Sequence, residues 1–280
     1  MALDGTSGVP PPPAPPPSFL DGDGFSVVCE IEPSRKPDIE RVRDQIDVLN
    51  PHVNAFLIPD NHLGRATVSS VAVAHEVAYM GGRGVACLNA RDRNLLGFRR
   101  DLLTAASYEV DHFLFVYGDA PREGRRTEDL TVRGMIDEVR SFGEGPLFED
   151  YPAFRIGTVS KLGRDLAWRR RADFVFVQIT HSLDRLFRWR ESLDYDGKLY
   201  AGVLVLASSR MALRINASIP DIRVPSAVID KLDDHPEFGL DLACQQIQDI
   251  KASGAFDGVH LVPVTRYRQM AERLAELNLT

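Results

Sequence analysis

The chain has 280 residues, of which 44% are hydrophobic and 26% are charged, so it is long and apolar enough to bury a large core. Its net charge of −7 argues against nucleic acid or an anionic membrane as a partner. The three cysteines make no Cys-x-x-Cys pair, the start does not read as a signal peptide, and no apolar run reaches the ~18 residues of a membrane span, so we expect a cytoplasmic protein.

Residues 1–23 are predicted to form a disordered, Pro-rich tail. The segment from Pro10 to Pro17 reads P-P-P-P-A-P-P-P, which favours neither a helix nor a strand ladder. An inert tail is the simpler interpretation, and a Pro-rich ligand for a partner domain is the alternative. The folded domain is predicted to span residues 24–280.

Strand and helix patterns alternate from residue 25 onward. The first unit is an apolar strand, then a turn, then an amphipathic helix with Ile39, Val42, Ile46 and Leu49 on one face. Strands are predicted at 25–31, 53–58, 84–88, 112–117, 153–159, 173–179, 199–206 and 258–264. Helices are predicted at 38–49, 67–80, 93–107, 127–142, 161–170, 182–190, 209–215, 225–232, 237–253 and 265–277. Eight such units predict an α/β fold, a (β/α)8 TIM barrel with extra helices. A doubly wound sheet is the alternative, but no G-x-G-x-x-G follows any strand.

Ligands of such barrels bind at the C-terminal ends of the strands, so polar residues there are candidate site residues. Glu30 is notable because it lies inside an apolar run, where burial would favour the protonated acid that can donate a proton near neutral pH. The alternative is a structural Glu30 paired with a base such as Arg91. Asp119 ends the apolar run H-F-L-F-V-Y-G-D and is either a ligand-binding carboxylate or a turn residue.

A metal site is the alternative interpretation of the carboxylates at the strand ends, since Asp60, Asp92 and Asp119 could converge on a divalent ion. The sequence has no His-x-His or His-x-x-x-His pair, and His181 and His260 are isolated, so we predict no metal and structural roles for both histidines. No G-x-S-x-G motif or Cys–His pairing supports nucleophilic hydrolysis.

The strand ends together resemble the methylenetetrahydrofolate reductase family of (β/α)8 barrels, over about residues 25–278. The similar segments are V-C-E-I-E-P around Glu30, P-D-N at Pro59–Asn61, A-R-D-R-N at Ala90–Asn94, Y-G-D at Tyr117–Asp119, V-Q at Val177–Gln178 and G-V-H-L-V-P-V from Gly258. The resemblance implies reduction of 5,10-methylenetetrahydrofolate to 5-methyltetrahydrofolate, a step of one-carbon metabolism that serves methionine biosynthesis.

The resemblance also implies roles for individual residues. Glu30 would be the general acid, and Asp119 would be catalytic and contact the folate. The expected substrate-binding residues are Gln178, Asp119, Ser209 and Asn61. The expected cofactor-binding residues are Leu57, Asp60, Asn89, Arg91, Tyr117 and His181. We expect a small-molecule folate as substrate, with NADH or NADPH as the hydride source, while the oligomeric state stays open.

The chain departs from the family where the family's flavoproteins contact FAD. Those places here hold Tyr117, residues 129–134, residues 157–160, Ala167 and residues 170–173. The family's aromatic residue after strand 7 falls near Ser209. We therefore expect FAD to be absent or weakly bound, with hydride passing directly from the nicotinamide. The alternatives are a reductase with rebuilt FAD contacts and a non-catalytic folate-binding barrel.

Overall fold

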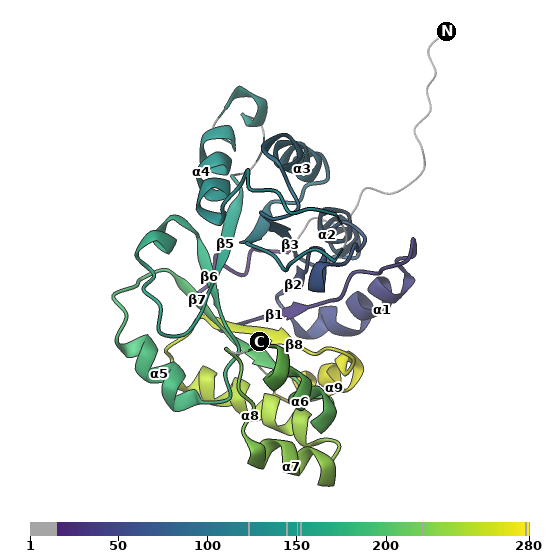
Figure 1. Ribbon diagram of the computed structural model, residues 1–280, viewed down its shortest axis with the longest axis vertical. Helices are drawn as coiled ribbons and strands as arrows, with labels where there is room; N and C mark the ends of the chain where they lie inside the picture. Colours follow the sequence, from purple (N-terminus) through teal and green to yellow (C-terminus); the bar gives the residue numbers. More distant parts are fainter. Residues whose placement is uncertain are drawn as a thin grey trace.

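The computed structural model describes residues 16–122, 124–143, 145–149, 151, 153–219, 221–277 and 279. These residues form a closed barrel in which each of eight parallel strands pairs with the next and β8 pairs with β1 (Figure 1). The strands are β1 Ser26–Glu30, β2 Ala55–Ile58, β3 Gly84–Asn89, β4 His112–Val116, β5 Arg155–Ser160, β6 Phe174–Val177, β7 Lys198–Leu204 and β8 Gly258–Val262. The predicted (β/α)8 barrel is confirmed, and all eight predicted strands are found within a few residues.

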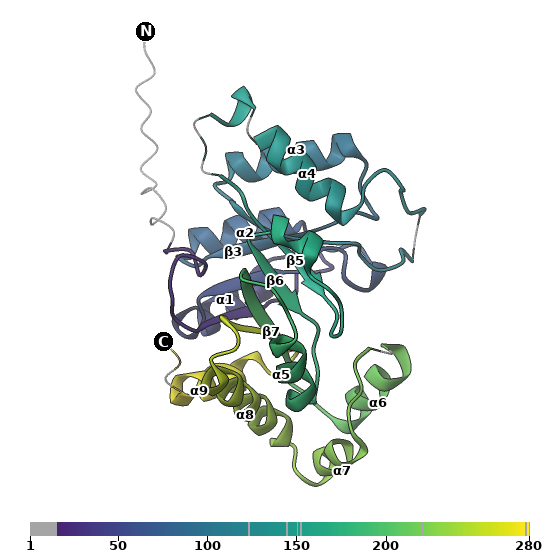
Figure 2. The same ribbon diagram turned by 90° about the vertical axis from the view of Figure 1, so that its left-hand side faces the viewer.

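Helices cover the outside of the barrel. They are α1 Glu40–Leu49, α2 Ser70–Tyr79, α3 Leu95–Ser107, α4 Val132–Gly143, α5 Leu183–Glu191, α6 Ser209–Ser218, α7 Ser226–Asp234, α8 Phe238–Ser253 and α9 Tyr267–Leu277. The helix α1 is amphipathic as expected, since it buries Val42, Ile46 and Leu49 on one face. The additional pair α6 and α7 lies between β7 and α8 in the chain and projects beyond the ring of helices in Figure 2.

The helix predicted at 161–170 is wrong. This connection between β5 and β6 contains only a short 3-10 helix, Ala167–Arg171. Gly163 has a φ of +79°, a left-handed conformation that an α-helix does not tolerate. The Asp165 Oδ1 atom accepts a hydrogen bond of 2.7 Å from the Ala167 amide, which starts the 3-10 turn. The connection between β5 and β6 is therefore a loop with one short 3-10 helix, where the other units have an α-helix.

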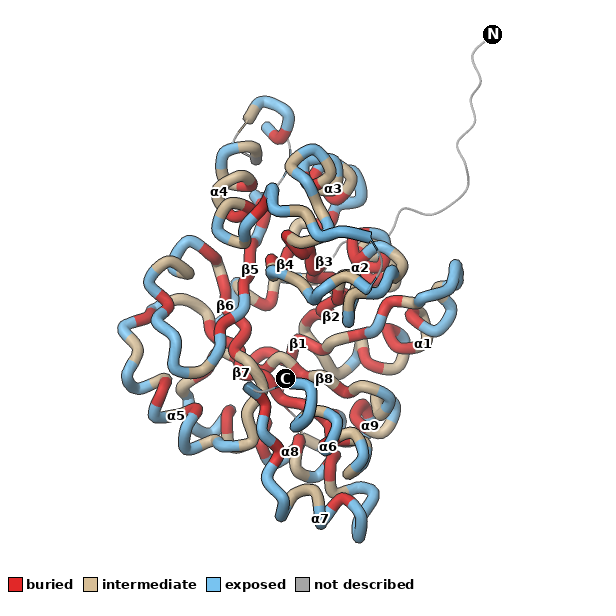
Figure 3. Tube along the Cα trace, in the orientation of Figure 1, coloured by how far each residue is buried: buried red, intermediate tan, exposed pale blue. Residues whose placement is uncertain are grey.

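Side chains along each strand alternate between the helical layer and the barrel interior. On β1, Val27 and Cys29 pack with the helices, whereas Val28 belongs to a separate cluster inside the barrel. Buried residues accordingly run along the strands in Figure 3, and exposed residues lie on the outer helices and loops. Both Cys29 and Cys87 are buried in this packing, and burial raises the pKa of each thiol.

The segment just before β1 closes the N-terminal end of the barrel. Phe19 is 5% exposed, and its ring meets Phe174 and Tyr200 edge to face at centroid distances of 5.4 Å. Its carbonyl accepts a hydrogen bond of 3.2 Å from the Tyr200 hydroxyl. Residues 16–23 therefore do not belong to a disordered tail as predicted, because Phe19 has an apolar site to fill. Residues 1–15 of the predicted tail lie outside the described residues.

Hydrogen bonds fix the same segment to the first residues of the strands. The Ser18 hydroxyl is 2.7 Å from Nε2 of the buried His112, whose Nδ1 is 2.6 Å from Asp111. Arg83 bonds both Asp111 oxygens at 3.1 and 3.2 Å. The chain before β1 is thus part of the folded barrel.

Phe19→Ala should lower the free energy of unfolding by about 3–5 kcal/mol, the range typical of a buried phenylalanine. The expected cause is a cavity among Phe174 and Tyr200. Urea denaturation measures the change, with Tyr79→Ala on the exposed face of α2 as the control. Equal stability of the Phe19→Ala protein and wild type would show that the segment does not support the barrel.

Candidate functional site

Glu30 is the last residue of β1, and the strand alternation turns its side chain toward the barrel interior. Its Oε2 lies 3.4 Å from Nε2 of His260 on β8, with the carboxylate side chain 22% exposed and the histidine 14% exposed. The two strands are neighbours in the closed barrel, with Val28 opposite His260. Glu30 is therefore a partly buried acid next to a single imidazole.

His260 has a fixed orientation. Its ring is stacked on Phe176 of β6, with centroids 4.8 Å apart and planes 10° apart. Its Nε2 is buried and makes no hydrogen bond of good geometry with the described part of the chain, so its polar contact is the one with Glu30. We expected His260 to be structural, but this pairing places it in the candidate site. The sequence does place His260 two residues after Gly258 in a predicted strand. Only the register of β8 against β1 shows that this position faces the barrel interior beside Glu30.

Asn89 connects two of the predicted site residues. Its side chain is 1% exposed, and Nδ2 donates to Asp60 Oδ2 at 2.7 Å and to Asp92 Oδ2 at 2.9 Å. Its Oδ1 accepts from the Asp92 amide at 2.9 Å. Asn61 donates to the same Asp92 oxygen at 3.0 Å. The ends of β2 and β3 are thereby joined by one polar network.

Arg93 supplies the positive charge of this network. It contacts Asp60 Oδ2 and bonds Asp101 at 2.7 Å. Burial by itself would lower the pKa of Arg93, but the charges and hydrogen bonds of the two carboxylates outweigh it and raise the pKa above its usual value. Asp60 is therefore neutralised by a permanent cation. Across the described residues, no group of three or more His, Cys, Asp or Glu side chains is placed to hold a metal ion.

Asp119 lies after β4 and contacts the loop after β2. Its Oδ2 accepts a hydrogen bond of 2.9 Å from the Leu63 amide. The neighbouring Gly118 has a φ of +91°, which turns the chain out of the strand. Asp119 is exposed, so its other oxygen is available to a ligand. Within the described part of the chain, the Leu63 amide is thus the hydrogen-bond partner of Oδ2, and Oδ1 has none.

Arg91 and Tyr117 form a second pair at the same rim. The guanidinium lies over the Tyr117 ring, 4.6 Å from its centroid, and the Arg91 amide bonds the Tyr117 carbonyl at 3.2 Å. The Arg91 Nε is buried and has no hydrogen-bond partner among the described residues. The tyrosine is 47% exposed. These two predicted cofactor residues therefore lie together, and Arg91 does not pair with Glu30.

Gln178 follows β6 and lines a cavity of about 130 Å³, together with Lys161, Leu162, Ile179, Arg185 and Asp221. Its Oε1 accepts a hydrogen bond of 3.0 Å from the Ile179 amide. The Gln178 side chain thus has its amide nitrogen as a donor, and one lone pair of its oxygen, to meet a ligand.

Three further predicted residues have different surroundings. Leu57 is 3% exposed inside the barrel. Burial lowers the pKa of His181, and neither of its buried ring nitrogens has a partner among the described residues. The Ser209 hydroxyl donates to Asp233 of α7 at 2.5 Å. Ser209 is therefore engaged in the α6–α7 pair, away from the contacts that join the other site residues.

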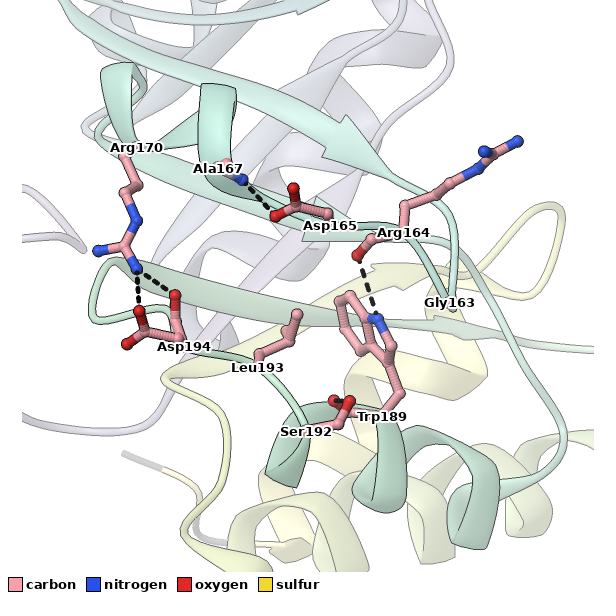
Figure 4. A pocket seen from close by; sticks show the side chains of 9 residues that line it. All are labelled: Gly163, Arg164, Asp165, Ala167, Arg170, Trp189, Ser192, Leu193 and Asp194. Carbon is pink, nitrogen blue, oxygen red and sulfur yellow. Dashed lines mark hydrogen bonds and ion pairs between the residues drawn. The ribbon is translucent and has the colours of Figure 1, made fainter.

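A cavity of about 540 Å³ lies on the barrel flank beside the short connection between β5 and β6. Figure 4 shows that the Arg164 side chain points away from it, while the Arg164 carbonyl accepts from Trp189 Nε1 at 3.3 Å. Arg170 is paired with Asp194 at 3.2 Å. These contacts join polar groups of the cavity wall to one another. None of the predicted site residues lines this cavity.

Comparisons with known proteins identify the fold. No family model matches the chain, and no curated protein matches its sequence. An uncharacterized protein from Clostridium thermocellum that binds two copies of 5-methyl-5,6,7,8-tetrahydrofolic acid is similar with a TM-score of 0.62 and 11% identity, over 93% of this chain and 96% of that one.

Two other solved structures are similar over most of this chain. The spore cortex-lytic enzyme SleL of Bacillus cereus has a TM-score of 0.53 and 9% identity, over 91% of this chain and 74% of that one. A mutant tryptophan synthase α-subunit from Pyrococcus furiosus has a TM-score of 0.51 and 11% identity, over 90% and 97%. These similarities establish a (β/α)8 barrel and leave its activity to the site residues. Within the described chain, no helix is long and apolar enough to cross a membrane.

Asn89→Ala should lower the free energy of unfolding by about 2–4 kcal/mol, because it removes two hydrogen bonds that a buried side chain donates to the carboxylates of Asp60 and Asp92. Asn94→Ala removes only the cap at the start of α3, where its side chain accepts from Gly97, and should cost about 1 kcal/mol. Urea denaturation of both variants measures the difference. Equal losses would mean that the network does not stabilise the rim.

Proposed function

We propose that the protein reduces 5,10-methylenetetrahydrofolate to 5-methyltetrahydrofolate with NADH or NADPH. In this reaction a proton reaches N10 of the folate, the bond between N10 and the methylene carbon breaks, and a 5-iminium cation forms. A hydride from the dihydronicotinamide then adds to that carbon, and the nicotinamide leaves oxidised. One proton and one hydride are consumed for each folate that is reduced.

Glu30 carries the proposal. An inward-facing acid at the C-terminal end of a barrel strand lies where ligands of this fold react. Its carboxyl group would deliver the proton to N10, and His260, whose Nε2 lies 3.4 Å away, would return a proton to it after each turnover. A folate-binding role alone would not need an acid at this position.

Other predicted residues fit the remaining steps. The free oxygen of Asp119 would stabilise the iminium cation or accept from the amino edge of the pterin, and the Gln178 amide would donate to the folate. Leu57, Asp60, Asn89, Arg91, Tyr117 and His181 would form the nicotinamide side of the site, with Asn61 on the folate side. Ser209 fits less well, because its hydroxyl is already bonded to Asp233.

The similarity to the Clostridium thermocellum protein supports a folate ligand, since that protein binds the product of the proposed reaction. The same similarity favours a second candidate, a folate-binding barrel that performs no reduction. NADH oxidation distinguishes the two, because only the reductase consumes the nicotinamide when folate is added. A flavin spectrum in the purified protein would instead identify an FAD-dependent reductase.

The experiment is an absorbance spectrum of the purified protein, followed by a test of NADH and NADPH oxidation with methylenetetrahydrofolate present. We expect no flavin bands and oxidation that depends on the folate. Tight folate binding without any oxidation of either nicotinamide would contradict the proposed reductase.

Glu30→Gln should reduce turnover by roughly 10²–10⁴-fold, the range typical of a lost general acid, because glutamine keeps the shape but holds no transferable proton. Folate affinity should stay within a few-fold of wild type.

The matched control is Glu32→Gln, two residues farther along and paired with Arg35 at 3.7 Å. It should turn over normally. If Glu30→Gln has near-normal turnover, the proton comes from another group.

A further inference from the structure

Leu63 has an unusual backbone conformation for its residue type. It lies on the loop after β2 with φ 58° and ψ 28°, in the left-handed region that a leucine side chain disfavours. Its side chain is 47% exposed, so the strain is not compensated by full burial in the core. Sparsely populated conformations of this kind concentrate at ligand-binding sites.

The loop after β4 holds this conformation in place. Asp119 Oδ2 accepts from the Leu63 amide at 2.9 Å, and the Gly64 carbonyl accepts from the Arg122 amide at 2.9 Å. A Cβ on Gly64 would lie 2.0 Å from the Ala120 carbonyl oxygen, so only glycine permits this approach. Two loops from different strands therefore lock the Leu63 backbone.

The position of Leu63 suggests what it contacts. Both loops leave the C-terminal ends of their strands, the rim where barrel ligands bind. Tyr117, also 47% exposed, lies two residues before Asp119. An exposed apolar side chain on a backbone that is already fixed offers a flat ligand ring a contact at a reduced ordering cost.

We propose that Leu63 packs against a planar heteroaromatic ring, either the pterin or the dihydronicotinamide, and that Asp119 positions it. This inference rests on the proposed function. Leu63 is then a specificity-determining contact, made equally in the ground state and in the transition state. Its loss should raise KM and leave kcat unchanged.

Leu63→Ala and Leu63→Gly test the contact together. Both remove the side chain and should raise KM about tenfold for one of the two substrates, a loss in keeping with part of a leucine side chain. The substrate whose KM changes identifies the ring. Leu63→Gly also relieves the left-handed strain, so its Tm should equal or exceed that of wild type by about 1–4 °C. A gain in Tm together with a loss of affinity would not arise from a structural role.

The control is Leu103→Ala, since Leu103 on α3 is 43% exposed and lies in a regular helix. Its KM values should match wild type. KM values within twofold of wild type for both substrates in Leu63→Ala would overturn the inference. A Tm loss of many degrees in Leu63→Gly would also overturn it, because Leu63 would then be a core residue.

Two changes at Asp119 separate its charge from its hydrogen bond. Asp119→Asn removes the charge, which should lower kcat, and it keeps an oxygen acceptor for the folate and for the Leu63 amide, so KM should stay close to wild type. Asp119→Ala removes the acceptor as well, so it should add the KM increase seen in Leu63→Ala. Identical KM values in the two Asp119 variants would show that Asp119 does not act through Leu63.

These outcomes are distinct from failure of the proposed function. If wild type oxidises neither NADH nor NADPH with the folate present, the proposed reductase activity is wrong, whatever the Leu63 variants show. Fluorescence titration of wild type and Leu63→Ala with folate and with NADH still tests the ring contact, because it needs no turnover. An active wild type with unchanged Leu63 variants would overturn only the present inference.

Discussion

Closure of eight parallel strands into one barrel is the constraint on which the rest of the structure depends. Closure makes β1 and β8 neighbours, although they stand at opposite ends of the folded chain. The alternation of side chains then turns Glu30 and His260 into the same interior, 3.4 Å apart. Without the last strand pairing, Glu30 would have no base beside it, and His260 would have no acid.

The rim of the barrel combines two kinds of rigidity. One part is electrostatic, because the buried Asn89 holds Asp60 and Asp92 together and Arg93 balances their charge. The other part is conformational, because Asp119 holds Leu63 in a left-handed backbone state. Both fix the ends of β2, β3 and β4 before any ligand arrives, which reduces the ordering cost of binding.

The two ends of the barrel have different tasks. At the N-terminal end, Phe19 packs against Phe174 and Tyr200, and this packing stabilises the fold. At the C-terminal end, the side chains of Glu30 and Asp119 remain accessible to a ligand. This separation is typical of (β/α)8 barrels, where stability at one face allows strain and buried charge at the other.

The barrel could be predicted from the sequence, because apolar runs and helical periodicity are local patterns and eight repeats of strand and helix favour a (β/α)8 barrel over a doubly wound sheet. It also marked Glu30 and Asp119, since a carboxylate within or at the end of an apolar run is visible without a structure. Only the tertiary structure decided that His260 is the partner of Glu30, that Leu63 is the partner of Asp119, and that Phe19 fills the barrel end. Such pairings join distant segments, and their geometry depends on strand register and closure, which no local window contains.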